Sequence, residues 1–270
     1  MIIAASLVVA CSSPARIVPS ADDDETVPCT TDGHTTTAST MPATAPSSTS
    51  TSTTAPAPTT TLAPAPSYPS APVEVLSPQS LHVFSRIDTI DPVVFLTLDD
   101  GNVRDPRVVA LLAERGATAS LFLTAGPLSV DPAYFEQFIV AGGSVNSHTL
   151  CHPHLNDLSQ EQQQAEICGM VSQIEAAYGS AGYFLRPPYG DYNDATVAAA
   201  RSCGVRALIL WRVTLNNGVI DTWGTSPIHA GDIILTHFRD DLYDNLVVLF
   251  AELDRLGLTV APLEDYLPIA

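Results

Sequence analysis

The sequence predicts an α/β domain built around a parallel β-sheet and preceded by a disordered linker. From residue 75 to residue 270, short apolar runs of strand length alternate with longer amphipathic segments of helix length. This alternation is typical of a parallel sheet whose strands are joined by helices. Residues 12–74 are instead rich in Thr, Ser, Pro and Ala, and such a composition buries too little apolar surface to offset the entropy lost on ordering.

The expected strands are short and mostly apolar. Residues 93–98 read Val-Val-Phe-Leu-Thr-Leu, a run of the kind found in strands that are buried on both faces. The sequence places the other strands at 118–124, 143–146, 183–185, 206–211, 232–236 and 258–261. Roughly seven strands therefore alternate with helices.

Start and stop signals bound the expected helices. Asp131-Pro132 pairs an N-cap residue with a proline at the first helical position. Ser159 opens a Ser-Gln-Glu-Gln run that is close to a capping box, and Gly116 ends a helix. The helices are expected at 106–115, 131–141, 159–178, 193–203 and 241–256, with one more helical turn close to residue 270.

The first eleven residues form a short apolar run that ends in Val8-Val9-Ala10-Cys11 and resembles a bacterial lipobox. This resemblance predicts a lipoprotein-type signal segment, 1–11, with Cys11 as the lipid anchor; a plain secretory signal and a frayed apolar end are the alternatives. No stretch of the sequence reaches the roughly 18 consecutive apolar residues of a membrane-spanning helix. We therefore expect an extracytoplasmic protein that is lipid-anchored or secreted and that contacts the membrane only through the anchor.

The charge balance excludes several partners. The chain has 29 acidic residues against 11 basic ones, a formal net charge of −18, and all the basic residues are arginines. Nucleic-acid binding needs basic patches that displace counterions from phosphates, and anionic lipid headgroups repel an acidic surface. We expect a monomer that binds no nucleic acid.

Cysteine usage fits an oxidising compartment. Cys168 and Cys203 lie in two successive predicted helices, and we expect a disulfide between them. Cys151 lies between two histidines, His148 and His152, and is either a metal ligand or a small buried side chain.

Polar residues of four clusters follow directly after expected strands. In a (β/α) barrel such positions share the rim where active sites form, so we expect the four clusters to converge. Each has a plainer explanation when taken alone, as a turn, a chance histidine pair, a rigid loop or a core histidine. The clusters are Thr97-Leu98-Asp99-Asp100-Gly101, His148-Thr149-Leu150-Cys151-His152, Arg186-Pro187-Pro188-Tyr189-Gly190 and Ile233-Ile234-Leu235-Thr236-His237.

Two of these clusters together suggest a metal centre. His148 and His152 are four residues apart and can reach one ion from a helix or from a tight loop. With one aspartate they supply three ligands and leave a position for water, as in hydrolytic zinc centres. The neighbouring aspartate is then available as a base. His154 is expected to be a surface residue and not a ligand.

In this order and spacing, the four clusters resemble the motifs of the NodB-type polysaccharide deacetylases, carbohydrate esterase family 4. Leu98 stands where the family usually has Phe, and Ile234 stands where it has Leu. The resemblance spans about residues 92–267, which is nearly the whole predicted domain. It implies a distorted (β/α)7 barrel that removes N-acetyl groups from amino sugars of an extracellular glycan, with peptidoglycan as the expected substrate.

The resemblance also implies a role for each motif residue. Asp100, His148 and His152 would bind Zn²⁺ or another divalent ion such as Co²⁺. Asp99 would be the base that activates the metal-bound water, and His237 would be the acid that protonates the departing amine.

Further residues would support this chemistry. Arg186 would orient Asp99 and lower its pKa, and the Tyr189 N–H would stabilise the oxyanion together with the metal. Trp211 and Leu235 would line the pocket for the acetyl methyl group.

The sequence departs from the family at its fourth motif, Asp-x-x-Asp-Trp. After Trp211, Thr214 and Asn217 stand where the two acids would be, and Gly218 replaces the tryptophan. Asp221, further along this loop, is a candidate to replace the acid that supports His237. The departure leaves two alternatives open: an amidase or esterase acting on a non-sugar substrate, and a glycan-binding surface lipoprotein with little turnover.

Overall fold

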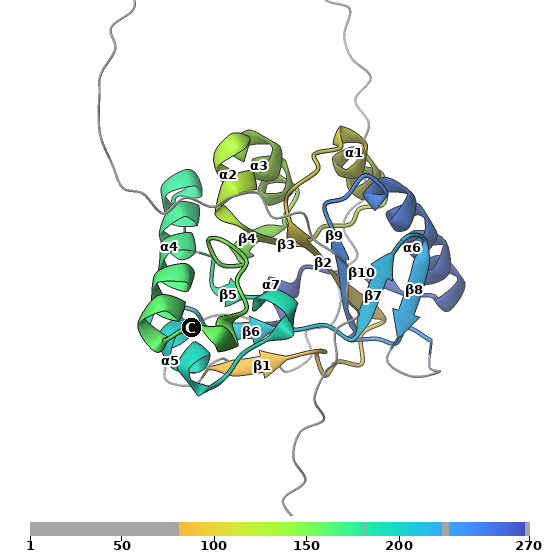
Figure 1. The fold of residues 1–270 in the computed structure, drawn as a ribbon. Coiled ribbons are helices and arrows are strands. Elements are labelled where there is room, and N and C mark those ends of the chain that lie inside the picture. The colour runs from red at the N-terminus through yellow and green to blue at the C-terminus, as the bar shows by residue number, and fades with distance from the viewer. Residues whose placement is uncertain (1–80, 181, 223–226, 268–270) are drawn as a thin grey trace, which may run out of the picture.

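A computed structural model describes residues 81–180, 182–222 and 227–267, which form an α/β fold with a strongly curled sheet (Figure 1). The signal segment 1–11 with Cys11, the linker 12–74 and the start of the predicted domain at residue 75 lie outside the described residues. Trp223 also lies outside them.

The sheet is parallel apart from one hairpin. Its strand order is β1-β6-β5-β4-β3-β2-β9-β7-β8, and β10 pairs with β2 off this path. All the pairings between these strands are parallel except β7 with β8. The strands are β1 His82–Phe84, β2 Val93–Asp100, β3 Ser120–Leu123, β4 Ser144–Ser147, β5 Phe184–Leu185, β6 Ala207–Ile209, β7 Val213–Asn216, β8 Val219–Thr222, β9 Ile233–His237 and β10 Thr259–Val260.

Helices surround the outside of the curled sheet, with α4 and α5 on one side and α1 and α6 on the opposite side (Figure 1). No helix of the described segments is long and apolar enough to cross a membrane. The helices are α1 Pro106–Glu114, α2 Ala125–Val130, α3 Pro132–Val140, α4 Gln160–Tyr178, α5 Asp194–Ser202, α6 Leu242–Leu256 and α7 Leu263–Tyr266, with short 3-10 turns at Leu155–Asp157 and Pro188–Gly190.

The predicted elements are confirmed with small shifts at their ends, because the capping signals act locally. The Asp131 side chain accepts from the Tyr134 N–H, and Ser159 and Gln162 form a complete capping box. Four elements were not predicted: β1, α2, β7 and β8. Each has six residues or fewer, a length over which hydrophobic periodicity is weak.

The curled sheet forms a distorted barrel, as the family resemblance implied. Its path runs from β1 to β8, and β1 continues into an isolated antiparallel bridge between Arg86 and Asp232, just before β9. The Ile87 N–H donates to the Gly231 carbonyl at 2.7 Å there. The bridge and this hydrogen bond join the chain just after β1 to the chain just before β9.

Strand β2 is buried on both faces, which positions the site at its end. Leu96 and Leu98 belong to the apolar cluster that includes residues of the outer helices, whereas Phe95 belongs to a second cluster with Phe122, on β3. Because successive side chains of a strand alternate between its faces, Asp99 follows Phe95 into the barrel interior.

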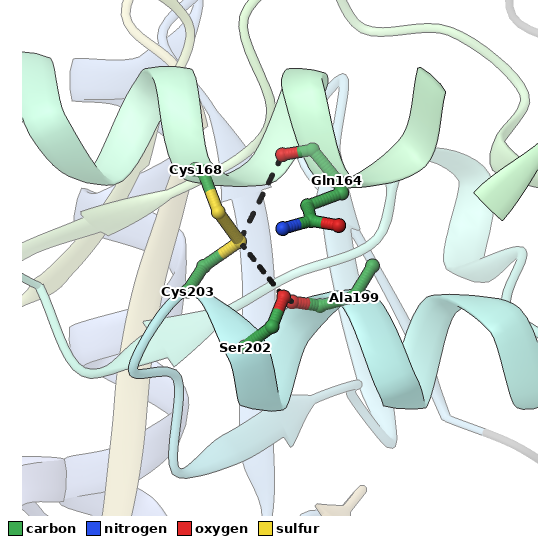
Figure 2. Close-up of a disulfide and its surroundings, with 5 residues drawn as sticks. All are labelled: Gln164, Cys168, Ala199, Ser202 and Cys203. Atoms are coloured by element: carbon green, nitrogen blue, oxygen red, sulfur yellow. Dashed lines mark hydrogen bonds between the residues drawn. A yellow bond between two sulfur atoms is a disulfide. The ribbon is translucent and has the colours of Figure 1, made fainter. Parts of the chain in front are cut away.

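The predicted disulfide between Cys168 and Cys203 is confirmed, and it joins α4 to the end of α5 (Figure 2). Cys203 Sγ lies 3.8 Å from the Gln164 carbonyl oxygen and 3.9 Å from the Ser202 hydroxyl. The bridge closes a chain segment with a sequence separation of 35.

We expect the Cys168→Ser, Cys203→Ser double variant to lose about 3 to 4 kcal/mol of unfolding free energy, because a loop of this length costs that much entropy to close. Urea unfolding of the two proteins measures the difference. Ser202→Ala, which keeps the bridge, is the matched control. An unchanged midpoint in the double variant would contradict the prediction.

Candidate active site

The two adjacent aspartates at the end of β2 face the same histidine. Asp99 Oδ2 and Asp100 Oδ1 each lie 3.6 Å from His148 Nε2. Neighbouring residues of a regular strand would point to opposite faces, but Asp100 has a left-handed backbone with φ of 71°. Gly101 follows with φ of 96°, and a Cβ there would lie 3.0 Å from Leu123, among other side chains. This backbone turn brings both carboxylates to one site.

The loop after β4 supplies the two histidines. Thr149 and His152 both have positive φ, and the Thr149 hydroxyl accepts from the His152 N–H at 3.1 Å. Glu166, on α4, accepts from the Cys151 N–H at 2.9 Å and ties the loop to that helix. The tight loop turns both imidazoles toward each other, with the two Nε2 atoms 3.1 Å apart.

Asp100, His148 and His152 form a possible metal site. Their ligand atoms lie within 4.8 Å of one another, and Asp100 Oδ1 is 3.6 Å and 3.7 Å from the two Nε2 atoms. Donors bound at about 2 Å to a tetrahedral zinc ion lie about 3.3 Å apart. Two imidazole nitrogens and one carboxylate oxygen at these separations fit a divalent ion with a further position open to water.

His148 is held in the form that a metal ligand needs. Its Nδ1–H donates to the Arg186 carbonyl at 2.7 Å, which leaves the Nε2 lone pair directed at the site. Burial and the neighbouring His152 lower the pKa of His148 to about 3, so the ring is neutral at pH 7.

Arg186 is fully buried inside the barrel and organises the site. Its Nη1 donates to Asp99 Oδ1 at 2.6 Å and to the Thr97 hydroxyl at 2.8 Å. Its Nε–H donates to the Ile209 carbonyl, and its Nη2 donates to the Leu210 carbonyl. One residue thus fixes the Asp99 carboxylate through its side chain and His148 through its carbonyl.

Burial outweighs the arginine in setting the charge of Asp99. Arg186 lowers the pKa of Asp99, as the sequence predicted, but desolvation raises it further, and the net result is a pKa of about 6. A carboxyl with a pKa in this range is suited to proton transfer near neutral pH.

Tyr189 lies above the histidines in a strained backbone, with φ of 60°. Its ring makes an edge contact with His152 and stacks on His154 at 3.9 Å between centroids. His154 Nδ1 lies 2.8 Å from Asp191 Oδ2. His154 is therefore exposed and packs on Tyr189 instead of joining the ligand group, as expected.

His237 ends β9 next to β2, where it pairs in register with Asp99. Its Nδ1 lies 3.3 Å from Asn216 Oδ1, at the end of β7. Burial and nearby positive side chains, Arg239 first among them, lower the pKa of His237 to about 3.

The sequence profile of the polysaccharide deacetylase family matches residues 86–208. An uncharacterized protein of Streptomyces coelicolor is 40% identical over 194 residues, which are 68% of this chain and 77% of that protein. The chain belongs to the NodB-type polysaccharide deacetylases of carbohydrate esterase family 4. A peptidoglycan-N-acetylglucosamine deacetylase of Bacillus cereus is 27% identical over 193 residues, 65% of this chain and 90% of that protein.

The family fold extends to members without activity. A family 4 pseudoenzyme from Bacillus anthracis has a TM-score of 0.60 and 22% identity, covering 69% of each chain. A fold match alone therefore does not distinguish active polysaccharide deacetylases from inactive ones. The distinction depends on the side chains at the site.

Two expectations about this candidate site are corrected by the structure. Asn216, and not the expected Asp221, lies beside His237; Asp221 is exposed on β8 and pairs with Thr214 across the hairpin. Cys151 is disulfide-bonded and half-buried, so it is neither a thiolate ligand nor a simple buried side chain.

Of the two expected acetyl pocket residues, Trp211 lies close to the buried arginine. Leu235 is buried on β9, and the half-buried Trp211 ring has the Arg186 guanidinium carbon 5.7 Å from its centroid. A Cβ on Gly190 would lie 3.3 Å from the same ring. Trp211 thus lies between the arginine and the segment that carries Tyr189.

Backbone strain is concentrated at this site. Among the residues that the structure describes, the non-glycine positions with positive φ are Asp100, Thr149, His152, Tyr189 and Asn217. Each such conformation costs about 1 to 3 kcal/mol and persists where the surrounding contacts enforce it. Four of the five belong to the ligand loop, the paired carboxylates or the Tyr189 turn.

Proposed function

We propose that this chain is a metal-dependent hydrolase that removes N-acetyl groups from amino sugars of an extracellular glycan, with peptidoglycan as the first candidate. One observation carries the proposal: a group of three possible metal ligands, Asp100, His148 and His152, lies beside a second buried carboxylate, Asp99, which is bonded to Arg186. A hydrolase needs both a place for a metal ion and a base next to it.

Zn²⁺, or another divalent ion such as Co²⁺, would be held by Asp100, His148 and His152. The ion would lower the pKa of water and polarise the acetyl carbonyl. Two neutral imidazoles and one carboxylate leave a bound divalent ion with a net positive charge, which suits this role.

The protein's own groups would move the protons. Asp99, held by Arg186, would accept a proton from the attacking water, and the Tyr189 N–H would donate to the developing oxyanion. His237 would give its Nε2 proton to the amide nitrogen as the C–N bond breaks, which releases acetate and a free amine. Trp211 and Leu235 would enclose the acetyl methyl group.

The layout of the chain supports an extracytoplasmic location. The sequence combines a lipobox-like end at Cys11, a hydroxyl-rich spacer and a deacetylase domain that carries a disulfide. We propose a monomer that is anchored to the outer face of the cytoplasmic membrane through Cys11 and acts on cell-wall glycan.

We expect the purified chain to release acetate from peptidoglycan or from N-acetylglucosamine oligomers, and to lose this activity when a chelator removes the metal. Added Zn²⁺ should restore it, because the divalent ion supplies the activation of water that this chemistry needs. Acetate release and metal content are measured together. Zinc binding at one ion per chain with no acetate from any glycan would contradict the proposal and favour a non-sugar substrate or a binding role.

A further inference from the structure

The β7–β8 hairpin determines which residue supports His237. Asn217 and Gly218 form a two-residue loop with φ of 51° and 72°, the conformation that Asn-Gly favours in hairpins. In the parallel pairing of β7 with β9, Thr214 lies opposite Leu235. Two residues further along both strands, on the same face, Asn216 comes beside His237, whereas Asn217 belongs to the turn.

The hairpin is fixed to α6, so Asn216 has a defined place. The Asn217 N–H donates to Asp241 Oδ2 at 2.9 Å, and the Gly218 N–H donates to Asn245 Oδ1 at 2.7 Å. Asn245 is buried in α6. The end of β7 is therefore held from both sides, by the helix and by β9.

The contact with Asn216 selects one form of His237. Asn216 Oδ1 lies 3.3 Å from His237 Nδ1, and since an amide oxygen only accepts, Nδ1 carries the proton. The opposite nitrogen, Nε2, then bears a proton only when the ring is cationic. An amide oxygen orients such a ring, but it stabilises the positive charge less than a carboxylate would.

Two arginines near His237 also oppose a cationic ring: Arg239, two residues later in the sequence, and Arg186, directly after β5. His148 and His152, from the loop after β4, oppose it only when they are protonated. Asp99 pairs in register with His237 across β2 and β9, but its carboxylate forms an ion pair with Arg186. A change of the side chain at Asn216, which contacts Nδ1, should therefore alter the charge of His237 most.

We propose that Asn216 is a positioning residue for His237, and that its neutral amide limits how much of His237 carries the proton it must donate. This inference rests on the proposed deacetylase function, in which His237 is the acid. It assigns the role of the missing fourth-motif acid to a residue that the motif spacing did not indicate.

Asn216→Asp tests the proposal, because it places a carboxylate at Nδ1 with almost no change in volume. In the zinc-loaded protein, we expect NMR titration to show the pKa of His237 raised by about one to three units. The alkaline limb of the pH profile of kcat/KM should move up by the same amount, so that activity above that limb rises about tenfold for each unit. Asn216→Ala should lower kcat without an upward shift.

Asn217→Asp is the matched control, since it adds the same charge one residue away, in the turn. It should leave both the His237 titration and the pH profile unchanged. Equal His237 titrations in Asn216→Asp and Asn217→Asp would overturn the inference. A specific titration shift in a protein that releases no acetate would instead overturn the proposed function and the catalytic part of the inference, and would leave the Asn216–His237 contact supported.

Discussion

We expect Arg186→Met to lower the unfolding free energy by about 3 to 5 kcal/mol, because it removes one partner of a buried ion pair and leaves the other without compensation. Arg186 is 0% exposed and Asp99 is 2% exposed. The substitution also removes the donor to Thr97 and the donors to the Ile209 and Leu210 carbonyls. Urea or thermal unfolding of the purified variant measures the loss.

The same variant should lose acetate release by a factor of about 100 or more, because a misplaced or protonated base removes general-base catalysis. Burial already raises the pKa of Asp99 to about 6 against the pull of Arg186. Without the arginine this pKa rises further, and Asp99 becomes protonated at pH 7.

The dependence on pH gives an independent check of this prediction. A carboxyl whose pKa is raised on folding binds more protons in the folded state, so its contribution to stability falls as pH rises from about 4 to about 6. Near pH 4.5 Asp99 is neutral with or without the arginine. The stability deficit of Arg186→Met should therefore be smaller there than at pH 7.

Arg255→Met is the matched control. Arg255 lies 2.6 Å from Glu252, the same separation as Arg186 from Asp99, but its side chain is 64% exposed. Exposed pairs of this kind contribute little, so no measurable change is expected. If the two variants lost the same unfolding free energy, burial would not explain the contribution of the Arg186–Asp99 pair to stability.

Much of the fold is predictable because its signals are local. The apolar run that forms β2, the Asp131-Pro132 helix start and the Ser159 capping box each act within a few residues, and each has its expected structure. The contact between the chain after β1 and the chain before β9 is different. It includes a bridge between Arg86 and Asp232, two residues far apart in sequence with no pattern that pairs them.

The candidate site also has a part that the sequence predicts and a part that it does not. Strand order alone predicted that Asp99, Asp100 and His148 would converge, and the structure places both carboxylates 3.6 Å from His148 Nε2. Motif spacing put Thr214 and Asn217 at the positions of the family's two acids, Asp221 was the candidate to support His237, and Asn216 was missed. The signal was in the sequence: Asn217-Gly218 is a strong hairpin turn, and a turn there makes Asn216 the last strand residue.

Two matched substitutions, Asp99→Asn and Asp100→Asn, should separate the adjacent carboxylates into a base and a metal ligand. Asp100 Oδ1 lies within 3.7 Å of both histidine Nε2 atoms, so Asp100→Asn should weaken zinc binding by more than about 100-fold. Asp99 is instead bonded to Arg186. Asp99→Asn should therefore keep zinc and lower kcat by about 100-fold to 10,000-fold. Metal titration and acetate release measure the two effects.

Asp221→Asn makes the same chemical change at an exposed carboxylate of the β7–β8 hairpin and should alter neither property. The decisive comparison is between metal affinity and turnover. If Asp99→Asn lost zinc as readily as Asp100→Asn, both carboxylates would be ligands and the site would have no base in the position that the geometry provides. If Asp99→Asn retained both zinc and turnover, the base would lie elsewhere, and the buried Arg186–Asp99 pair would serve only to hold the barrel interior together.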